Sequence, residues 1–146
     1  MCNKCSPFIE QAMAYCEERG LRLTEPRAQV LGIVVEAGHP ITAYEALEAL
    51  GKLVKNPKPP TVYRALEFLQ KAGLVHRIES MNAYVACGGE HAHGGGQFLI
   101  CDECGDVQEV HISKMEKNIQ LETGAMGFKA GHWSAEIHGT CKDCQD

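Results

Sequence analysis

The sequence has no run of ~18 apolar residues, so we expect no membrane-spanning helix and no membrane partner. Residues 1–5 also lack the apolar stretch of a secretory signal peptide. Without an export signal, eight cysteines among 146 residues indicate the reducing cytoplasm, where thiols bind metal more often than they form disulfides. We therefore expect a cytoplasmic protein.

Excess positive charge is absent as well, because the net charge is −5. Such a chain is a poor candidate for indiscriminate binding to nucleic acid. The charge is uneven, however. Residues 1–86 carry ten Lys or Arg against nine Asp or Glu, a net of +1, whereas residues 87–146 carry four against ten, a net of −6. A specific DNA site can still be bound if the cations of the first part share one surface.

Two pairs of cysteines share one spacing, Cys101-x-x-Cys104 and Cys141-x-x-Cys144. They offer four soft thiolate ligands, which suits a closed tetrahedral Zn²⁺ site of the structural kind. The 36 residues between the pairs exceed the ~15–20 of a minimal zinc ribbon, so a folded module must lie between them. The alternatives are disulfides, or a redox pair of the thioredoxin type, which would not need the second pair of cysteines.

Residues 1–86 predict four helices followed by a hairpin. Caps and prolines place the helix starts near Ser6, Thr24, Thr42 and Pro60. In the fourth helix, apolar residues recur at helical spacing and leave Tyr63 and Arg64 on the exposed side. Two strand-like segments follow, at 74–79 and 83–86. This order indicates a winged helix-turn-helix, whose last helix enters the major groove of DNA. The alternative is a helical interaction module with a solvated polar face.

The second half of the chain predicts a smaller α+β region. Five glycines within residues 88–96 indicate a hinge. Beyond it we expect strands at 97–101, 107–112 and 133–138, with a helix capped by Ser113 between the last two. One helix and a few strands bury little surface, so this region is expected to dimerise.

The predicted fold class is therefore α+β, an N-terminal winged helix-turn-helix followed by a small α/β dimerisation domain with a structural zinc. Its expected parts are a DNA-binding domain over 1–86, a hinge loop over 87–97 and a dimerisation and metal-binding domain over 98–146.

Motifs along nearly the whole chain resemble those of the ferric uptake regulator superfamily of bacterial metal-sensing repressors. They are Leu23-Thr24-x-x-Arg27, Thr61-Val62-Tyr63-Arg64-Ala65-Leu66, Gly73-Leu74-Val75, Cys101-Asp102-x-Cys104-Gly105 and Ile137-His138-Gly139-x-Cys141-x-x-Cys144. Within the superfamily the chain is most similar to the zinc uptake regulator branch, through Val75-His76-Arg77-x-Glu79-Ser80 and Tyr84-Val85-x-Cys87. The resemblance implies a homodimer in which metal binding closes the hinge and allows the winged helices to bind operator DNA.

A sensor of this kind needs a reversible metal site separate from the structural one. The resemblance places its ligands at His76, Cys87 and Glu109 and requires a histidine shortly before the first cysteine pair. His93 is the favoured fourth ligand and His91 the alternative. One thiolate with imidazoles disfavours Mg²⁺ and Mn²⁺, and Zn²⁺ outbinds Fe²⁺ at a given N/O/S site. We therefore expect about two Zn²⁺ per chain, one structural and one regulatory.

Two residues of the fourth helix are the main candidates for reading DNA. Arg64 is suited to bidentate contact with guanine, and Tyr63 to contact with a thymine methyl or a phosphate. The further DNA-binding candidates are Thr61 on the same helix and, for the DNA backbone, Arg27, Tyr44, Lys58 and Arg77.

The sequence thus predicts a zinc-responsive transcriptional repressor of double-stranded operator DNA, with no enzymatic activity and no small-molecule substrate. An iron- or peroxide-responsive repressor of the same superfamily is the nearest alternative. A zinc hydrolase would need an open coordination position, which four protein ligands do not leave. A redox switch at Cys2 and Cys5 is another alternative, and His111, His132 and His138 are weaker candidates for a further metal site.

Overall fold

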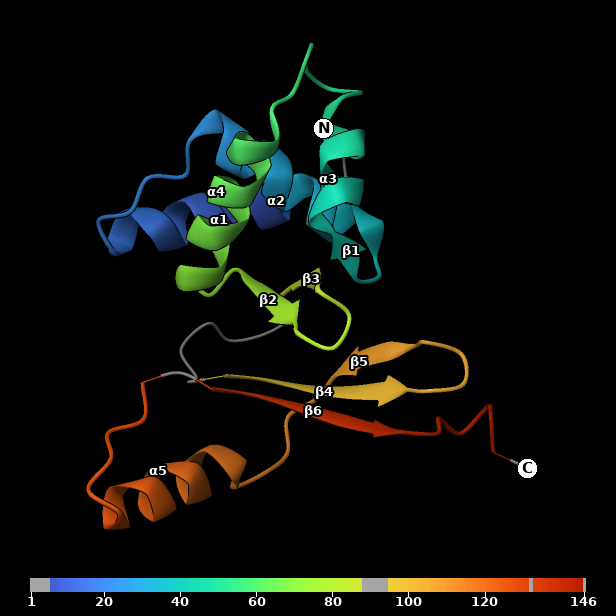
Figure 1. Ribbon diagram of the computed structural model, residues 1–146. Coiled ribbons are helices and arrows are strands. Elements are labelled where there is room, and N and C mark those ends of the chain that lie inside the picture. The colour runs from blue at the N-terminus through green and yellow to red at the C-terminus, as the bar shows by residue number, and fades with distance from the viewer. Residues whose placement is uncertain (1–5, 88–94, 132, 146) are drawn as a thin grey trace. The chain divides into compact units, whose positions relative to one another are not determined.

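The computed structural model describes residues 6–87, 95–131 and 133–145. The chain divides into two compact units, Met1–Cys87 and Gly88–Asp146, whose helices and strands are labelled in Figure 1. Within the described residues, no helix has the length and apolar character needed to cross a membrane.

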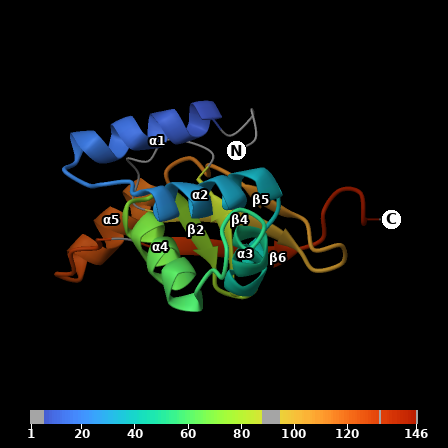
Figure 2. The ribbon, with the colours of Figure 1, turned by 90° about the horizontal axis from the view of Figure 1, so that it is seen from above.

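Four helices make up most of the first unit: α1 (Ser6–Glu18), α2 (Glu25–Ala37), α3 (Ala43–Leu50) and α4 (Pro59–Lys71). Their starts follow the predicted capping signals. Thr42 and Glu45 form the capping box of α3, because the Glu45 N–H donates to Thr42 Oγ1 at 3.1 Å and the Thr42 N–H donates to Glu45 Oε1 at 3.1 Å. Seen from above, α1 lies beside α2 at the edge of the helical layer (Figure 2).

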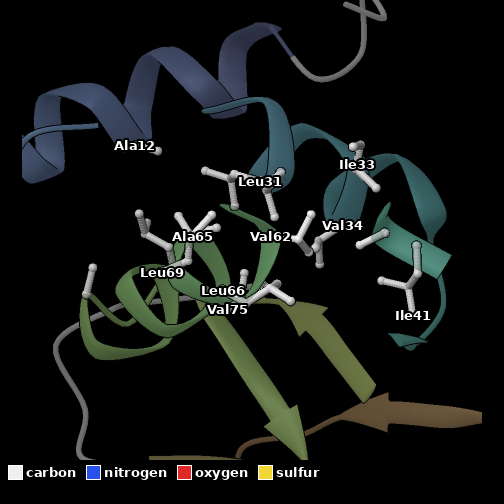
Figure 3. Close-up of a cluster of buried hydrophobic side chains, with 14 of the residues drawn as sticks. Ala12, Leu31, Ile33, Val34, Ile41, Val62, Ala65, Leu66, Leu69 and Val75 are labelled. Carbon is white, nitrogen blue, oxygen red and sulfur yellow. The ribbon is translucent and has the colours of Figure 1, made fainter. Parts of the chain in front are cut away.

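A three-stranded antiparallel sheet completes this unit, in the order β1 (Ile41–Thr42), β3 (Ala83–Ala86), β2 (Val75–Ile78). The β2–β3 hairpin is the wing predicted from the sequence. The core lies where the helices meet each other and the sheet, and Leu31, Val62 and Leu66 are fully buried there (Figure 3). The winged helix-turn-helix is thereby confirmed.

The second unit contains a sheet in the order β5 (Val107–Glu109), β4 (Gly95–Cys101), β6 (Trp133–Gly139), and one helix, α5 (Met115–Ala125). Strand β4 is antiparallel to β5 and parallel to β6. Among its described residues, Phe98, Ile100 and Cys101 are the only buried apolar side chains. No residue of α5 is buried. This unit therefore has a very small core of its own.

Three boundaries in the second unit differ from the prediction. Strand β5 ends at Glu109, three residues before the predicted end at 112. Strand β4 starts at Gly95, so residues 95–97 belong to the sheet and not to the hinge; Gly95 and Gly96 are held there by parallel pairing with Trp133 and Ser134. Helix α5 is preceded by Lys114 in place of Ser113, because Lys114 takes a left-handed conformation with φ of 71° before the helix begins.

Candidate metal centres and DNA-contacting surface

The four cysteines of the two pairs lie together in the second unit. Strands β4 and β6 run parallel with Cys101 opposite Gly139, so the turn after β4 and the turn after β6 emerge at the same end of the sheet. The four sulfur atoms all lie within 4.8 Å of one another, and Cys104 Sγ is 3.8 Å from Cys141 Sγ. The cysteine cluster predicted from the spacing is therefore formed.

Main-chain hydrogen bonds shape both turns of the cluster. Gly105, with φ of 78°, directs its N–H to the Cys101 carbonyl at 2.9 Å, and the Cys144 N–H donates to the Cys141 carbonyl at 3.0 Å. The Cys141 N–H donates to Cys101 Sγ at 3.3 Å, which links the two turns. Four converging sulfurs with main-chain donors fit a structural Zn²⁺ site.

The same hydrogen bonds set the protonation of the thiols. Main-chain N–H groups of Cys104 and Cys141 lower the pKa of Cys101 to about 6, because they stabilise its thiolate. Hydrogen bonding to the sulfurs of Cys141, Cys101 and Cys104 raises the pKa of Cys144 to about 12. At neutral pH, Cys101 is therefore a thiolate and Cys144 a thiol.

We expect zinc binding at the cysteine cluster to release protons from Cys104 and Cys144, because hydrogen bonding with neighbouring sulfurs raises the pKa of both thiols. For each proton that zinc displaces, the apparent affinity for zinc falls about tenfold per pH unit as the pH decreases between the pKa values of Cys144 and Cys101. Below about pH 6, protonation of Cys101 adds to the loss and steepens it. Competition with a chelator across this pH range measures the slope, and an affinity independent of pH would contradict the assigned protonation.

His76 and Cys87 lie together in the first unit. His76 is on β2, opposite Val85 of β3, and Cys87 follows β3 directly. The Cys87 N–H donates to the Leu74 carbonyl at 2.9 Å, which extends the β2–β3 ladder by one residue and buries the thiol. A ring nitrogen of His76 and Cys87 Sγ lie within 4.8 Å of each other. This pair can offer one imidazole and one thiolate to a metal ion.

The other predicted ligands of the regulatory site belong to the second unit. Glu109 is the last residue of β5, opposite Phe98 of β4, and its side chain is partly buried. His91 and His93 lie outside the described residues, as do Cys2, Cys5 and His132.

Most of the predicted DNA-contacting residues lie on the surface of the first unit. Tyr63 is 59 % exposed on α4, and Arg64 beside it is exposed as well. Of the others, Thr61 is partly exposed, and Tyr44 and Lys58 are exposed. A tyrosine and an arginine presented at the start of the last helix are suited to reading base edges.

Arg27 and Arg77 make contacts within the unit that the sequence does not reveal. The Arg27 guanidinium lies 3.8 Å from the centroid of the Phe68 ring on α4, and its Nη1 donates to the Arg22 carbonyl at 2.7 Å. Arg77 donates from Nε and Nη2 to Asn82 Oδ1, at 3.2 and 3.0 Å, across the turn of the wing. Both side chains therefore stabilise the unit that carries the predicted DNA-contacting residues.

The sequence did not identify two polar residues of the second unit, Asp102 and Gln97, as contributors to the metal sites. Asp102 Oδ1 lies 3.2 Å from His138 Nδ1, and the Asp102 N–H donates to the Gly139 carbonyl at 2.8 Å, so the first cysteine turn is tied to β6. His138, a weak metal candidate in the sequence, thus pairs with a carboxylate. His111 is exposed. The second residue, Gln97, is buried within the sheet.

Comparison with known proteins gives consistent results. A sequence profile of the ferric uptake regulator family matches residues 18–138. The zinc uptake regulation protein of Escherichia coli (strain K12) is 39 % identical over 139 residues, covering 94 % of this chain and 81 % of the relative. The peroxide operon regulator of Bacillus subtilis (strain 168) is 29 % identical over 140 residues, covering 93 % and 92 %. A solved structure of a zinc uptake regulator complexed with zinc and DNA matches with a TM-score of 0.86 and 36 % identity, covering 98 % and 96 %.

The fold and the two groups of ligands define a class of protein, a winged helix joined to a small α+β unit that carries a four-cysteine cluster. The chain belongs to the ferric uptake regulator family.

Proposed function

We propose that this chain is a zinc-responsive transcriptional repressor that binds double-stranded operator DNA as a homodimer when a regulatory zinc site is filled. The observation that carries the proposal is the His76–Cys87 pair, an imidazole and a thiol that lie close together at the end of the winged-helix unit. Similarity to the E. coli zinc uptake regulation protein and to the zinc- and DNA-bound regulator supports it. As a DNA-binding regulator with thiolate ligands, it would act in the cytoplasm and have neither enzymatic activity nor a small-molecule substrate.

The four-cysteine cluster would hold the structural zinc. Its ligands are Cys101, Cys104, Cys141 and Cys144, and all four lie within the second unit. A structural zinc of this kind contributes folding free energy directly. Its expected role is to stabilise the second unit, whose core is too small to fold strongly by itself.

The regulatory zinc would take ligands from both units. His76 and Cys87 supply two of the four ligands that Zn²⁺ prefers, so two more are required. Glu109 and His93, with His91 as the alternative to His93, are the residues we assign from the second unit. Zinc held by ligands from both units would restrict how the winged helix is presented to DNA. To shift the protein from mostly unable to bind operator DNA to mostly able to bind it, zinc must bind the DNA-binding conformation more tightly than the other by roughly 5 kcal/mol.

A second copy of the chain would cover the apolar surface of the second unit. On and just after α5, Leu121, Met126 and Phe128 are 62 %, 78 % and 65 % exposed. Leu99 and Ile137, which are opposite one another on β4 and β6, are exposed as well. A small unit with large apolar side chains on its surface gains stability by burying them against a copy of itself.

We expect Arg64→Ala to weaken operator binding by ~1–3 kcal/mol and to relax its sequence specificity, because the arginine is placed to bond a guanine edge. Lys71→Ala is the matched control, since Lys71 lies at the far end of α4 and pairs with Glu67 at 3.0 Å. Fluorescence anisotropy with operator and random duplexes measures both effects. Equal losses on the two duplexes would show that Arg64 contacts only phosphate.

An iron- or peroxide-responsive repressor is the second candidate function. The similarity to the B. subtilis peroxide operon regulator supports this candidate. The Cys87 thiolate argues for zinc, because sulfur and nitrogen ligands bind Zn²⁺ more tightly than Fe²⁺. Titrating operator binding with each metal separates the candidates. Activation by Fe²⁺ at concentrations where Zn²⁺ fails would establish the iron sensor.

A further inference from the structure

Gln97 is the one polar side chain that is buried among the described residues, with 5 % of its surface exposed. A buried amide destabilises the fold unless its hydrogen bonds are made. Its Oε1 accepts a hydrogen bond from the Ile112 N–H at 2.7 Å, and its main-chain carbonyl accepts one from the Val110 N–H at 2.9 Å. Gln97 therefore binds the chain at two points just beyond β5.

These two hydrogen bonds continue the sheet past its last regular pair. Strand β5 ends at Glu109, which is opposite Phe98. Without the Gln97 side chain, the segment after Glu109 would keep only the bond from the Val110 N–H to the Gln97 carbonyl. Gly95 and Gly96 precede Gln97 and have no side chains, so Gln97 is the first residue of β4 that can make the second bond. The amide thus fixes the backbone immediately after Glu109.

We propose that Gln97 is a positioning residue for the regulatory zinc site, holding Glu109 in place by bonding the next residues of the chain to β4. The inference rests on the proposed function, which assigns Glu109 as a zinc ligand. An apolar side chain of similar length would fill the same space but could not bond the Ile112 N–H.

Gln97→Met tests this role, because methionine keeps the size and removes the acceptor. We expect the zinc concentration for half-maximal operator binding to rise roughly tenfold, as for other residues that orient metal ligands. Operator affinity at saturating zinc, dimerisation and the structural zinc should stay unchanged. Gln108→Met is the matched control, since Gln108 is exposed on the neighbouring strand. A variant that loses the structural zinc or weakens DNA binding at saturating zinc would overturn the proposal.

Glu109→Gln separates the failure of this inference from the failure of the proposed function. If Gln97 acts through Glu109, Gln97→Met adds no further shift in the Glu109→Gln background. If Glu109→Gln alone leaves the zinc response unchanged, the assignment of the regulatory site is wrong, and this inference falls with it. If Glu109→Gln shifts the response but Gln97→Met does not, only the positioning role is overturned.

Discussion

Replacing Cys101 with serine is expected to remove the structural zinc, unfold the second unit and dissociate the dimer. Cys101 is buried at the end of β4, and its sulfur accepts the Cys141 N–H that joins the two cysteine turns. The other buried apolar side chains described in this unit are Phe98 and Ile100. A structural zinc contributes roughly 10 kcal/mol or more in small zinc domains, which exceeds what two such side chains supply.

Zinc content per chain, molar mass in solution and circular dichroism measure the effect of Cys101→Ser. Glu103→Gln is the matched control, because Glu103 is exposed in the same turn and carries no sulfur. The first unit should keep its helices, since its core is formed by residues of its own four helices and sheet. A Cys101→Ser protein that stays dimeric with its full zinc content would rule out the structural role of the cluster.

Cys87→Ser is expected to abolish zinc-dependent operator binding while leaving the dimer and one zinc per chain. Serine matches the size of the buried thiol and preserves the main-chain bond to Leu74. Its hydroxyl is a poor zinc ligand at neutral pH, so the proposed regulatory site would lose one of its four assigned ligands. Loss of a residue that only orients a ligand costs ~10–100-fold in metal affinity, and loss of the ligand itself should cost more.

Zinc titrations of operator binding, together with zinc content and thermal unfolding, test this second prediction. Ala86→Ser is the control, because it adds a hydroxyl to the neighbouring position at the end of β3. Unfolding of the Cys87→Ser protein would identify Cys87 as a structural residue. The assignment of the two metal sites would then be wrong.

Local signals predicted most of the fold because they act within a few residues. The capping box of Thr42 and Glu45 and the apolar spacing in α4 both correspond to observed helices. Strand β1 has only two residues, Ile41 and Thr42, and forms through pairing with β3 more than forty positions away. No local pattern reveals such a strand.

Pairing between distant segments also explains the wrong start of β4. Glycines indicate a flexible loop when they are read alone, but Gly95 pairs with Trp133, far along the chain. The same limit applies to the sites. The spacing of the four cysteines predicts a metal cluster from the sequence alone. The burial of Gln97 and the stacking of Arg27 on Phe68 depend on tertiary packing, so no local pattern reveals them.

A zinc-edge anomalous difference map from crystals of the zinc-loaded dimer tests the central proposal most directly. We predict two peaks per chain. One lies among the four cysteines, and the other is bonded to His76, Cys87 and Glu109, at ~2.3 Å from the sulfur and ~2.0–2.2 Å from the nitrogen and oxygen. A map whose second peak contacts His76 and Cys87 but no ligand from the second unit would contradict the proposed switch.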